Sequence, residues 1–516
     1  MRTRNTIINI FASVAMGIIT ILAGFIARRI FAHTLGLEYL GINGLITDII
    51  SMLGIVELGL SSAIVYHLYK PVSDVDVPKI KSIINFYKKS YRVIALIVML
   101  IGVLVMPFLG TIVGKVNIPE NIYVIYLIFL ADIIFSYLLA YKQSILYADQ
   151  KNYIINLAHV IYVLIMNGLQ ITVLLTTGNF YLYLGVKVIA HIIENLVIYF
   201  VVNIRYPYLV SGETQPLDIA TKKDIIKKIK ALFIHKVGGY VIYGTDSIII
   251  SVFLGIAAVG LYSNYFLVIS AIIFIIGQVF TAITSNVGNL LVTSAPEKLY
   301  DVYNKLRFAN FWLATVTTIS FIVVMNSFVI LWLGGKYVLT YGVLIALGVN
   351  LYLQLMRHVT NSFKDAAGIF HEDRIVPIVE SIINIVCAIT FLHIFGLAGV
   401  FMGTVCSTLL LHLYSYPKYV YTVLFKRSNL TYYFEFIKYL FFVIIICGST
   451  FALSRVIDID SEILSFAYSL LVALALPNII LYAIFRKSEE FIYFKNLLSK
   501  IYSGLRGRVS LTKAGA

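Results

Sequence analysis

Long apolar runs, separated by short polar stretches, extend along almost the whole chain. Many of these runs reach the roughly 20 residues that an α-helix needs to cross the hydrocarbon core of a bilayer. The runs are continuous and do not alternate, which predicts helices rather than the strands of a membrane barrel. About fourteen membrane-length segments are expected, near residues 7–27, 39–66, 92–113, 121–147, 153–176, 180–203, 234–254, 258–292, 308–332, 339–363, 375–395, 397–420, 436–455 and 463–485.

Two short motifs indicate an internal duplication. Residues 35–41 read LGLEYLG and residues 254–260 read LGIAAVG, and both fit the pattern Leu-Gly-x-x-x-(Leu or Val)-Gly. The second copy lies 219 residues after the first, and each copy joins the first membrane-length segment of a half to the second. The repeat predicts two related helical bundles around a central cavity, an architecture that transporters use.

The composition agrees with a membrane protein. Of 516 residues, 60% are hydrophobic and 13% are charged, whereas a soluble domain is about half apolar and about a quarter charged. The first apolar run has no small-residue cleavage site, so we expect a membrane segment rather than a secretory signal. Cys387, Cys406 and Cys447 lie in apolar segments and are expected to be core residues. The sequence has neither zinc-ligand spacing nor a Walker A pattern, so we expect no metal or ATPase site.

The net charge of +15 is distributed unevenly along the chain. Lysine and arginine concentrate near the termini and in alternate loops, as the positive-inside rule predicts for an even number of spans with both termini in the cytoplasm. The charge therefore indicates topology and contact with anionic headgroups, and nothing around it favours nucleic-acid binding. Residues 222–236 alternate lysine with apolar residues, so we expect an amphipathic helix on the membrane surface.

Ionisable residues fall inside the predicted membrane segments, where an unpaired charge costs at least about 3 kcal/mol. Lys187, His191 and Glu194 share one helix face because they are spaced i, i+4 and i+7, although Lys187 and Glu194 are also candidates for a structural pair. Asp48 and Glu57 lie on opposite faces if their helix is straight, so one of them is expected to be structural. The residues expected to line a hydrated cavity or to bind a coupling ion are Asp48, Asp132, Lys187, His191, Glu194, Asp246, His358 and Glu380.

Three arginines are candidates for binding a substrate phosphate. Arg28 and Arg29 lie at the predicted outer end of the first segment, where the positive-inside rule disfavours arginine. Arg357 belongs to a polar stripe that runs along residues 350–361 of the tenth segment. Arginine stays charged at any working pH and binds phosphate through paired hydrogen bonds. The alternative interpretation of Arg28 and Arg29 is a helix-end pair that faces the outer headgroups.

Several longer stretches, spread over both halves, resemble a known family. They are ARRIFAHTLGLEYLGINGL at 27–45, DSIIISVFLGIAAVGLYSNY at 246–265, WLGGKY at 332–337, FKDAAGIFHEDR at 363–374 and FGLAGVFMGT at 395–404. In their order and spacing the chain resembles the Wzx-type polysaccharide repeat-unit flippases of the multidrug/oligosaccharidyl-lipid/polysaccharide exporter superfamily.

This resemblance implies an all-α polytopic membrane protein of about fourteen transmembrane helices. Two pseudo-symmetric six-helix lobes give alternating access to a central cavity, and a helix pair follows them. The implied substrate is an oligosaccharide repeat unit on undecaprenyl phosphate or pyrophosphate, moved from the inner to the outer leaflet, with Arg28 and Arg29 at positions that bind its phosphate. The expected boundaries are a first lobe at 1–204, a cytoplasmic amphipathic connection at 205–233, a second lobe at 234–420, and a helix pair with a basic cytoplasmic tail at 421–516.

The resemblance also implies a cellular setting. This setting is the bacterial cytoplasmic membrane and the synthesis of capsule or exopolysaccharide, with membrane lipids, a polysaccharide polymerase and chain-length machinery as partners. No cofactor is expected. The carboxylates and histidines at membrane depth leave coupling to H⁺ or Na⁺ open.

Three alternative functions stay open. The first is a flippase for lipid II or a teichoic-acid precursor, and the second is a multidrug or cation exporter of the same superfamily. Carboxylates at membrane depth favour the exporter, whereas the arginines disfavour it. The third is a membrane polymerase or ligase, which needs catalytic acids or bases at the membrane face. The expected outer loops are too short to build such a site, so a transporter rather than an enzyme is predicted.

Overall fold

The computed structural model describes an all-α chain. Its backbone is described for residues 2–57, 59–211, 215–369, 372–457, 459–497 and 499, and no strand occurs among these residues. Side chains are described for the same residues except 2–14, 231, 232, 234–243, 281, 282, 285, 286 and 292. Thirteen of the described helices are long and apolar enough to cross a membrane, which confirms the predicted polytopic fold. They overlap thirteen of the predicted segments, and the remaining one is represented by the shorter apolar stretch Gly244–Leu254.

The helices form two compact units. Unit 1 comprises residues 1–275 and 374–404, and unit 2 comprises residues 276–373 and 405–516. Helices α11 and α15 each contribute to both units. These units do not test the lobe boundaries expected from the sequence, which stay predictions.

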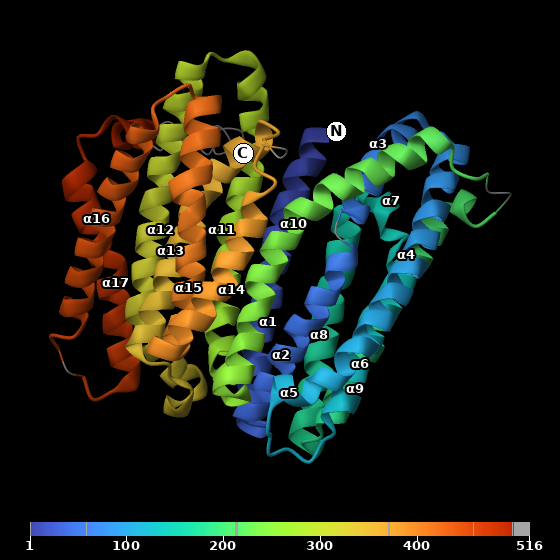
Figure 1. Cartoon of the computed structure of the whole chain (residues 1–516), viewed down its shortest axis with the longest axis horizontal. Helices are drawn as coiled ribbons and strands as arrows, with labels where there is room; N and C mark the ends of the chain where they lie inside the picture. Colours follow the sequence, from blue (N-terminus) through green and yellow to red (C-terminus); the bar gives the residue numbers. More distant parts are fainter. Residues whose placement is uncertain are drawn as a thin grey trace, which may run out of the picture. The chain divides into compact units, whose positions relative to one another are not determined.

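In unit 1, α1 packs along α8, and α9 packs against both α6 and α8 (Figure 1). Its elements are α1 (Arg2–Thr34), α2 (Leu37–Leu53), η1 (Gly54–Glu57), α3 (Leu60–Asp74), α4 (Val77–Val105), η2 (Met106–Phe108), α5 (Leu109–Val113), α6 (Ile122–Ala140), α7 (Gln143–Ala148), α8 (Asn152–Thr177), α9 (Phe180–Arg205), η3 (Pro207–Leu209), α10 (Ile219–Leu254), the first part of α11 (Ile256–Thr293), α14 (Val376–Phe395) and the first part of α15 (Leu397–Leu410).

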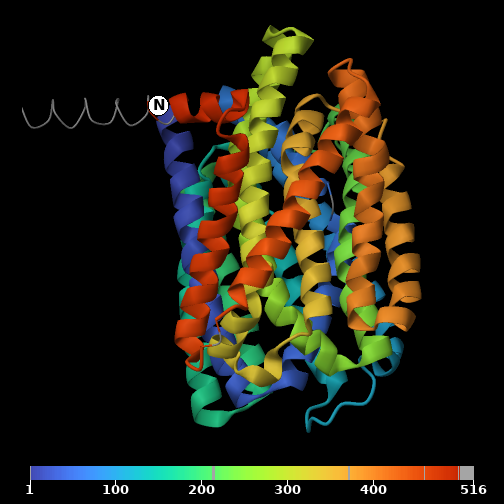
Figure 2. The same cartoon turned by 90° about the vertical axis from the view of Figure 1, so that its left-hand side faces the viewer.

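In unit 2, α12 lies beside both α13 and α17, and α16 packs against α17 (Figure 2). Its elements are the second part of α11, α12 (Pro296–Leu333), η4 (Gly335–Tyr337), α13 (Tyr341–Ala366), the end of α15, the π-helix η5 (Leu411–Leu424), α16 (Asn429–Ser454) and α17 (Glu462–Phe485).

Polar residues and glycine set the ends of several spans. Asn121 caps α6 and Asn179 caps α9, because each side chain accepts a hydrogen bond from a backbone N–H of the first turn. Asp218 caps α10 in the same way, through the N–H of Thr221 at 2.7 Å. Gly178 ends α8 in the left-handed conformation that glycine adopts without strain. These caps satisfy backbone groups where the chain leaves its apolar spans.

The segment predicted at 39–66 is wrong as a single span. Helix α2 gives way to the 3-10 turn η1, and α3 then begins a separate helix. Gly59 has φ +89°, a conformation that ends the first helix and starts the second in a new direction. Asp48 and Glu57 therefore do not share one straight helix, and the hydroxyl of Tyr91 donates a hydrogen bond to Glu57 Oε1.

One continuous helix, α10, combines the predicted amphipathic connection with the predicted seventh segment. It has 36 residues, which corresponds to about 54 Å at 1.5 Å per residue. The sequence of α10 contains no proline, so its backbone hydrogen bonding continues through the change from lysine-rich to apolar residues. Its first part contacts α3, and its later part contacts α2 and α15 (Figure 1).

Candidate functional site

The two copies of the repeated motif meet in unit 1. In both copies the second residue is a glycine at positive φ, +93° in the first copy and +89° in the second. A Cβ atom added to Gly41 would lie less than 3.0 Å from the carbonyl oxygen of Ile256. A Cβ atom added to Gly260 would lie equally close to the carbonyl oxygen of Leu37. The last residue of each seven-residue copy thus packs on the third residue of the other copy. Reciprocal contacts of this kind are expected when two segments are related by an approximate two-fold axis.

Arg28 reaches the same region from α1. Its Nε donates to Asn264 Oδ1 at 2.9 Å, and its Nη2 donates to Ser263 Oγ. Asn264 is fully buried and donates in turn to the carbonyl oxygen of Gly260 at 3.1 Å. Arg28 therefore braces the contact between the two motif copies. Arg29 is exposed on the next position of the helix.

A buried carboxylate lies on α10, near α14 and α15. Asp246 is only 2% exposed, and its Oδ2 accepts a hydrogen bond from Thr404 Oγ1 at 3.4 Å. The same hydroxyl accepts from Asn384 Nδ2 at 3.1 Å. Asp246 Oδ1 and Asn384 Oδ1 are buried and have no hydrogen-bond partner among the described residues. Glu380, one helical turn before Asn384 on α14, is also buried.

A second carboxylate approaches α10 from α2. Asp48 Oδ2 accepts a hydrogen bond of 2.5 Å from Ser247 Oγ, and Ser247 directly follows Asp246. Ser251, one turn further along α10, is buried and its hydroxyl has no partner among the described residues. Carboxylate, hydroxyl and amide oxygens with unused lone pairs are the ligands that hard cations prefer, and a carboxylate with an open lone pair also accepts a proton.

The donor set around Asp246 does not resemble a transition-metal site. Among the described residues, no group of three or more His, Cys, Asp or Glu side chains is arranged to hold a metal ion. The oxygen-rich surroundings fit a proton or a monovalent cation better than a soft metal.

Helices α6, α8 and α9 bring a third group of ionisable residues together. His191 Nδ1 donates to Asp132 Oδ1 at 2.8 Å, and Lys187 Nζ lies 4.0 Å from Asp132 Oδ2. Glu194 pairs instead with His159 Nδ1 at 3.0 Å. Lys187 and Glu194 therefore do not pair with each other, and both find partners on neighbouring helices. His159 was not singled out from the sequence, and its pairing with Glu194 depends on how α8 packs against α9.

The candidate residues of unit 2 lie on α13. Arg357 is partly buried there. His358 stacks on the ring of Phe280, with centroids 5.4 Å apart and planes 2° apart, and its Nε2 has no hydrogen-bond partner among the described residues. Whether Arg28, Arg29 and Arg357 bind phosphate stays a prediction.

The stretch FKDAAGIFHEDR contributes a buried ion pair in unit 2. Lys364, at the end of α13, pairs with Asp373, and both side chains are almost inaccessible to solvent. The hydroxyl of Ser415, on the π-helix η5, donates to Asp373 Oδ1 at 2.9 Å. This pair fixes the connection after α13 against η5, and residues 370 and 371 of that connection lie outside the described residues.

Comparison with known proteins agrees with this architecture. Residues 7–284 match the family described as "Polysaccharide biosynthesis protein". A search of curated proteins gives no match.

Three solved structures illustrate the likeness in fold. The lipid II flippase MurJ, in an inward closed conformation, has a TM-score of 0.64 at 16% identity, covering 92% of this chain and 98% of its own. An inward-facing multidrug resistance MATE family transporter of the MOP superfamily has a TM-score of 0.57 at 16% identity, covering 78% of this chain and 95% of its own. A mutant of the Vibrio cholerae MATE transporter VcmN has a TM-score of 0.53 at 16% identity, covering 78% and 93%.

These identities are low, so the solved structures establish the fold, whereas the family match covers just over half of the chain. The chain belongs to the polysaccharide biosynthesis protein family and is a multi-pass membrane protein whose fold is similar to those of the lipid II flippase and MATE transporter structures.

Proposed function

We propose that the protein is a flippase that moves an oligosaccharide repeat unit, linked to undecaprenyl phosphate or pyrophosphate, from the inner to the outer leaflet. The observation that carries the proposal is the family match in a chain that shares its fold with a lipid II flippase. The proposed location is the bacterial cytoplasmic membrane, with both termini in the cytoplasm. Membrane lipids, a polysaccharide polymerase and chain-length machinery are the proposed partners.

Elementary energetics explains why such a substrate needs a protein. A sugar headgroup carries many hydroxyls, and each one that enters hydrocarbon without a hydrogen-bond partner costs several kcal/mol. A hydrated, polar-lined route removes most of this penalty while the polyprenyl tail stays in the bilayer. Buried and half-buried polar residues on α2, α6, α9 and α10 of unit 1 support such a route.

Alternating access requires a contact that closes one end of the route and later opens, and the contact between the motif copies is suited to this role. We propose that this contact closes the outer end of the route and separates when the protein opens outward. The reciprocal packing of Gly41 and Gly260 supports this role, because a contact between backbones can form and break without unfolding either helix. The arginines Arg28, Arg29 and Arg357 are the proposed phosphate-binding residues, since arginine presents a rigid pair of donors to phosphate oxygens.

Asp246 is the proposed site of coupling to H⁺ or Na⁺. Its buried carboxylate has one oxygen without a partner among the described residues, and Thr404 and Asn384 add further oxygens nearby. A single charge that crosses the membrane potential supplies about 2.3 kcal/mol per 100 mV. An ion bound here is therefore a sufficient bias for a conformational change of a few kcal/mol.

A second candidate function is export of cations by the same fold. The likeness to a MATE family transporter and the buried carboxylate Asp246 favour it. Purified protein in liposomes distinguishes the two. A flippase renders a fluorescent, undecaprenyl-linked oligosaccharide accessible to an external glycosidase, and an exporter accumulates a cationic dye instead. Dye transport without movement of the glycolipid would reject the flippase proposal.

A further inference from the structure

The first part of α10 presents three different faces. Ile225 is fully buried and points into unit 1. At 100° per residue, Thr221, Asp224 and Lys228 lie on the flank beside Ile225, and these residues contact α3 and α4. The opposite flank and the side away from Ile225 are exposed. This part of the helix is therefore held in a fixed rotational orientation.

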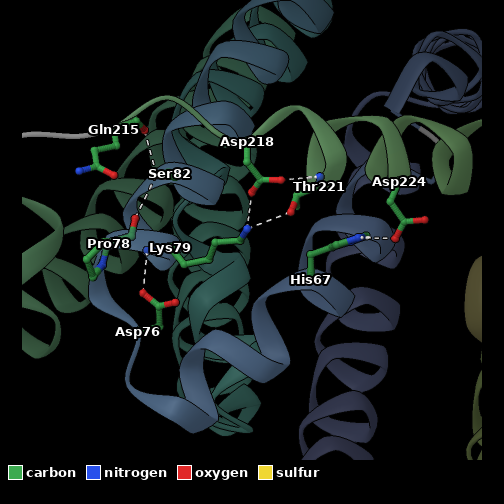
Figure 3. A network of polar contacts seen from close by, with 9 residues as sticks. All are labelled: His67, Asp76, Pro78, Lys79, Ser82, Gln215, Asp218, Thr221 and Asp224. Carbon is green, nitrogen blue, oxygen red and sulfur yellow. Dashed lines mark hydrogen bonds and ion pairs between the residues drawn. The ribbon is translucent and has the colours of Figure 1, made fainter.

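Polar contacts on the first flank tie α10 to α3 and to the first turn of α4 (Figure 3). Lys79 Nζ contacts Asp218 Oδ2 and donates to Thr221 Oγ1 at 2.9 Å. His67 Nε2 lies 2.9 Å from Asp224 Oδ2. The hydrogen bond from Lys79 holds the pKa of Asp218 below its usual range, and the hydrogen bond from His67 lowers the pKa of Asp224. Both shifts favour the ionised carboxylates that accept these hydrogen bonds.

An apolar stripe covers the opposite flank. Ile219, Ile226 and Phe233 recur every seven residues, which places them on one side of the helix. They are 73%, 38% and 39% exposed, so each of them keeps accessible apolar surface on this flank. Exposed lysines flank the stripe: Lys222 lies on one side of it, and Lys223, Lys227 and Lys230 lie on the other.

We propose that this stripe and its lysines dock on the anionic phospholipids of the inner leaflet. The helix itself supports this partner, because α10 continues without interruption into its apolar end at Gly244–Leu254. Its length of about 54 Å exceeds the roughly 30 Å of a hydrocarbon core, so its first part emerges at the headgroup level. Apolar residues flanked by lysines are typical of helices that lie in that interface, where anionic headgroups attract basic side chains.

This docking has a structural consequence. The polar contacts with α3 and α4 fix the rotation of α10, and the same helix carries Asp246 and Ser247 further along. An anionic leaflet therefore holds the stripe side of α10 while α3 and α4 hold the other side. This lipid contact does not depend on what the protein transports.

A tryptophan reporter tests the contact directly. The full-length Ile226→Trp variant is placed in nanodiscs of phosphatidylcholine and phosphatidylglycerol, with one or the other lipid brominated, and the quenching of the added emission is measured. Wild-type protein supplies the constant background from Trp312 and Trp332. An Ala220→Trp variant, exposed on another side of the same helix, is the matched reporter control.

We expect brominated phosphatidylglycerol to quench Ile226→Trp more strongly than brominated phosphatidylcholine and to quench Ala220→Trp weakly. Replacing Lys222, Lys223, Lys227 and Lys230 with glutamine should abolish the difference between the two lipids. The same change at four exposed lysines elsewhere, Lys70, Lys89, Lys298 and Lys487, should preserve it. An unquenched Ile226→Trp would mean that the stripe faces water or another protein, and equal quenching by both lipids would reject recognition of anionic headgroups.

Discussion

The backbone contact between the motif copies predicts a measurable effect of a single methyl group. In Gly260→Ala, the added Cβ meets the carbonyl oxygen of Leu37 at less than 3.0 Å and the backbone nitrogen of Gly41 at 3.1 Å. Both are backbone atoms, so no side chain can rotate away to make room. The two helices must separate, and the conformation described here must lose stability relative to one in which the copies are apart.

The expected magnitude follows from the cost of overpacking. Forcing extra atoms into a well-packed contact costs about 1–3 kcal/mol, and a bias of this size changes a conformational equilibrium roughly 5- to 150-fold. Gly168 on α8 offers a matched control, because a Cβ added there has no neighbour within 4 Å. Gly168→Ala should therefore leave the equilibrium unchanged.

Disulfide formation across the contact measures the equilibrium. A Cβ added to Gly44 lies 3.4 Å from the Cβ of Ser263, close to the separation of about 3.8 Å found in disulfides. The Gly44→Cys/Ser263→Cys pair should oxidise readily. Adding Gly260→Ala should slow this oxidation roughly 5- to 150-fold. Single-cysteine versions control for Cys387, Cys406 and Cys447. An unchanged oxidation rate in the Gly260→Ala background would refute the argument.

Four further substitutions test the assigned residues. Arg28→Ala or Arg357→Ala should lower glycolipid flipping about tenfold or more, since a hydrogen bond to a charged group contributes about 1.5–3 kcal/mol; unchanged flipping by the double variant would remove the proposed phosphate site. Asp246→Asn should leave a folded protein whose flipping no longer responds to an imposed H⁺ or Na⁺ gradient, and a retained response would relocate the coupling site. Asp373→Asn should destabilise unit 2 by about 3–5 kcal/mol, because it leaves the charge of Lys364 buried without its partner; a chemical-denaturation curve that matches wild type would contradict this role.

The helical spans were predictable because apolar length dominates their sequence signal. The break after α2 was harder to predict, since Gly54 and Gly59 lie in an otherwise apolar run and single glycines are common in membrane helices. The continuity of α10 was also missed. A change from lysine-rich to apolar composition resembles the boundary between a surface helix and a membrane span, although the helical backbone continues through it.

The site was predictable only in part. Asp246, Asp132 and His191 were identifiable because a charge at membrane depth is costly wherever it lies. Thr404, the partner of Asp246, carries no such signal, and helix packing decides which distant residue meets which charge. The repeat itself was visible in the sequence, whereas the reciprocal contact between its copies depends on tertiary structure.

The most direct test of the central claim is flipping of a fluorescent, undecaprenyl-linked oligosaccharide by the wild-type protein and the Gly44→Cys/Ser263→Cys variant in liposomes. Wild-type protein and the reduced variant should both move the glycolipid to the outer leaflet. Oxidation should stop the variant alone, and a reductant should restore its activity. Wild-type protein that moves no glycolipid would contradict the flippase assignment, and undiminished flipping by a fully crosslinked variant would contradict an outer contact that opens during transport.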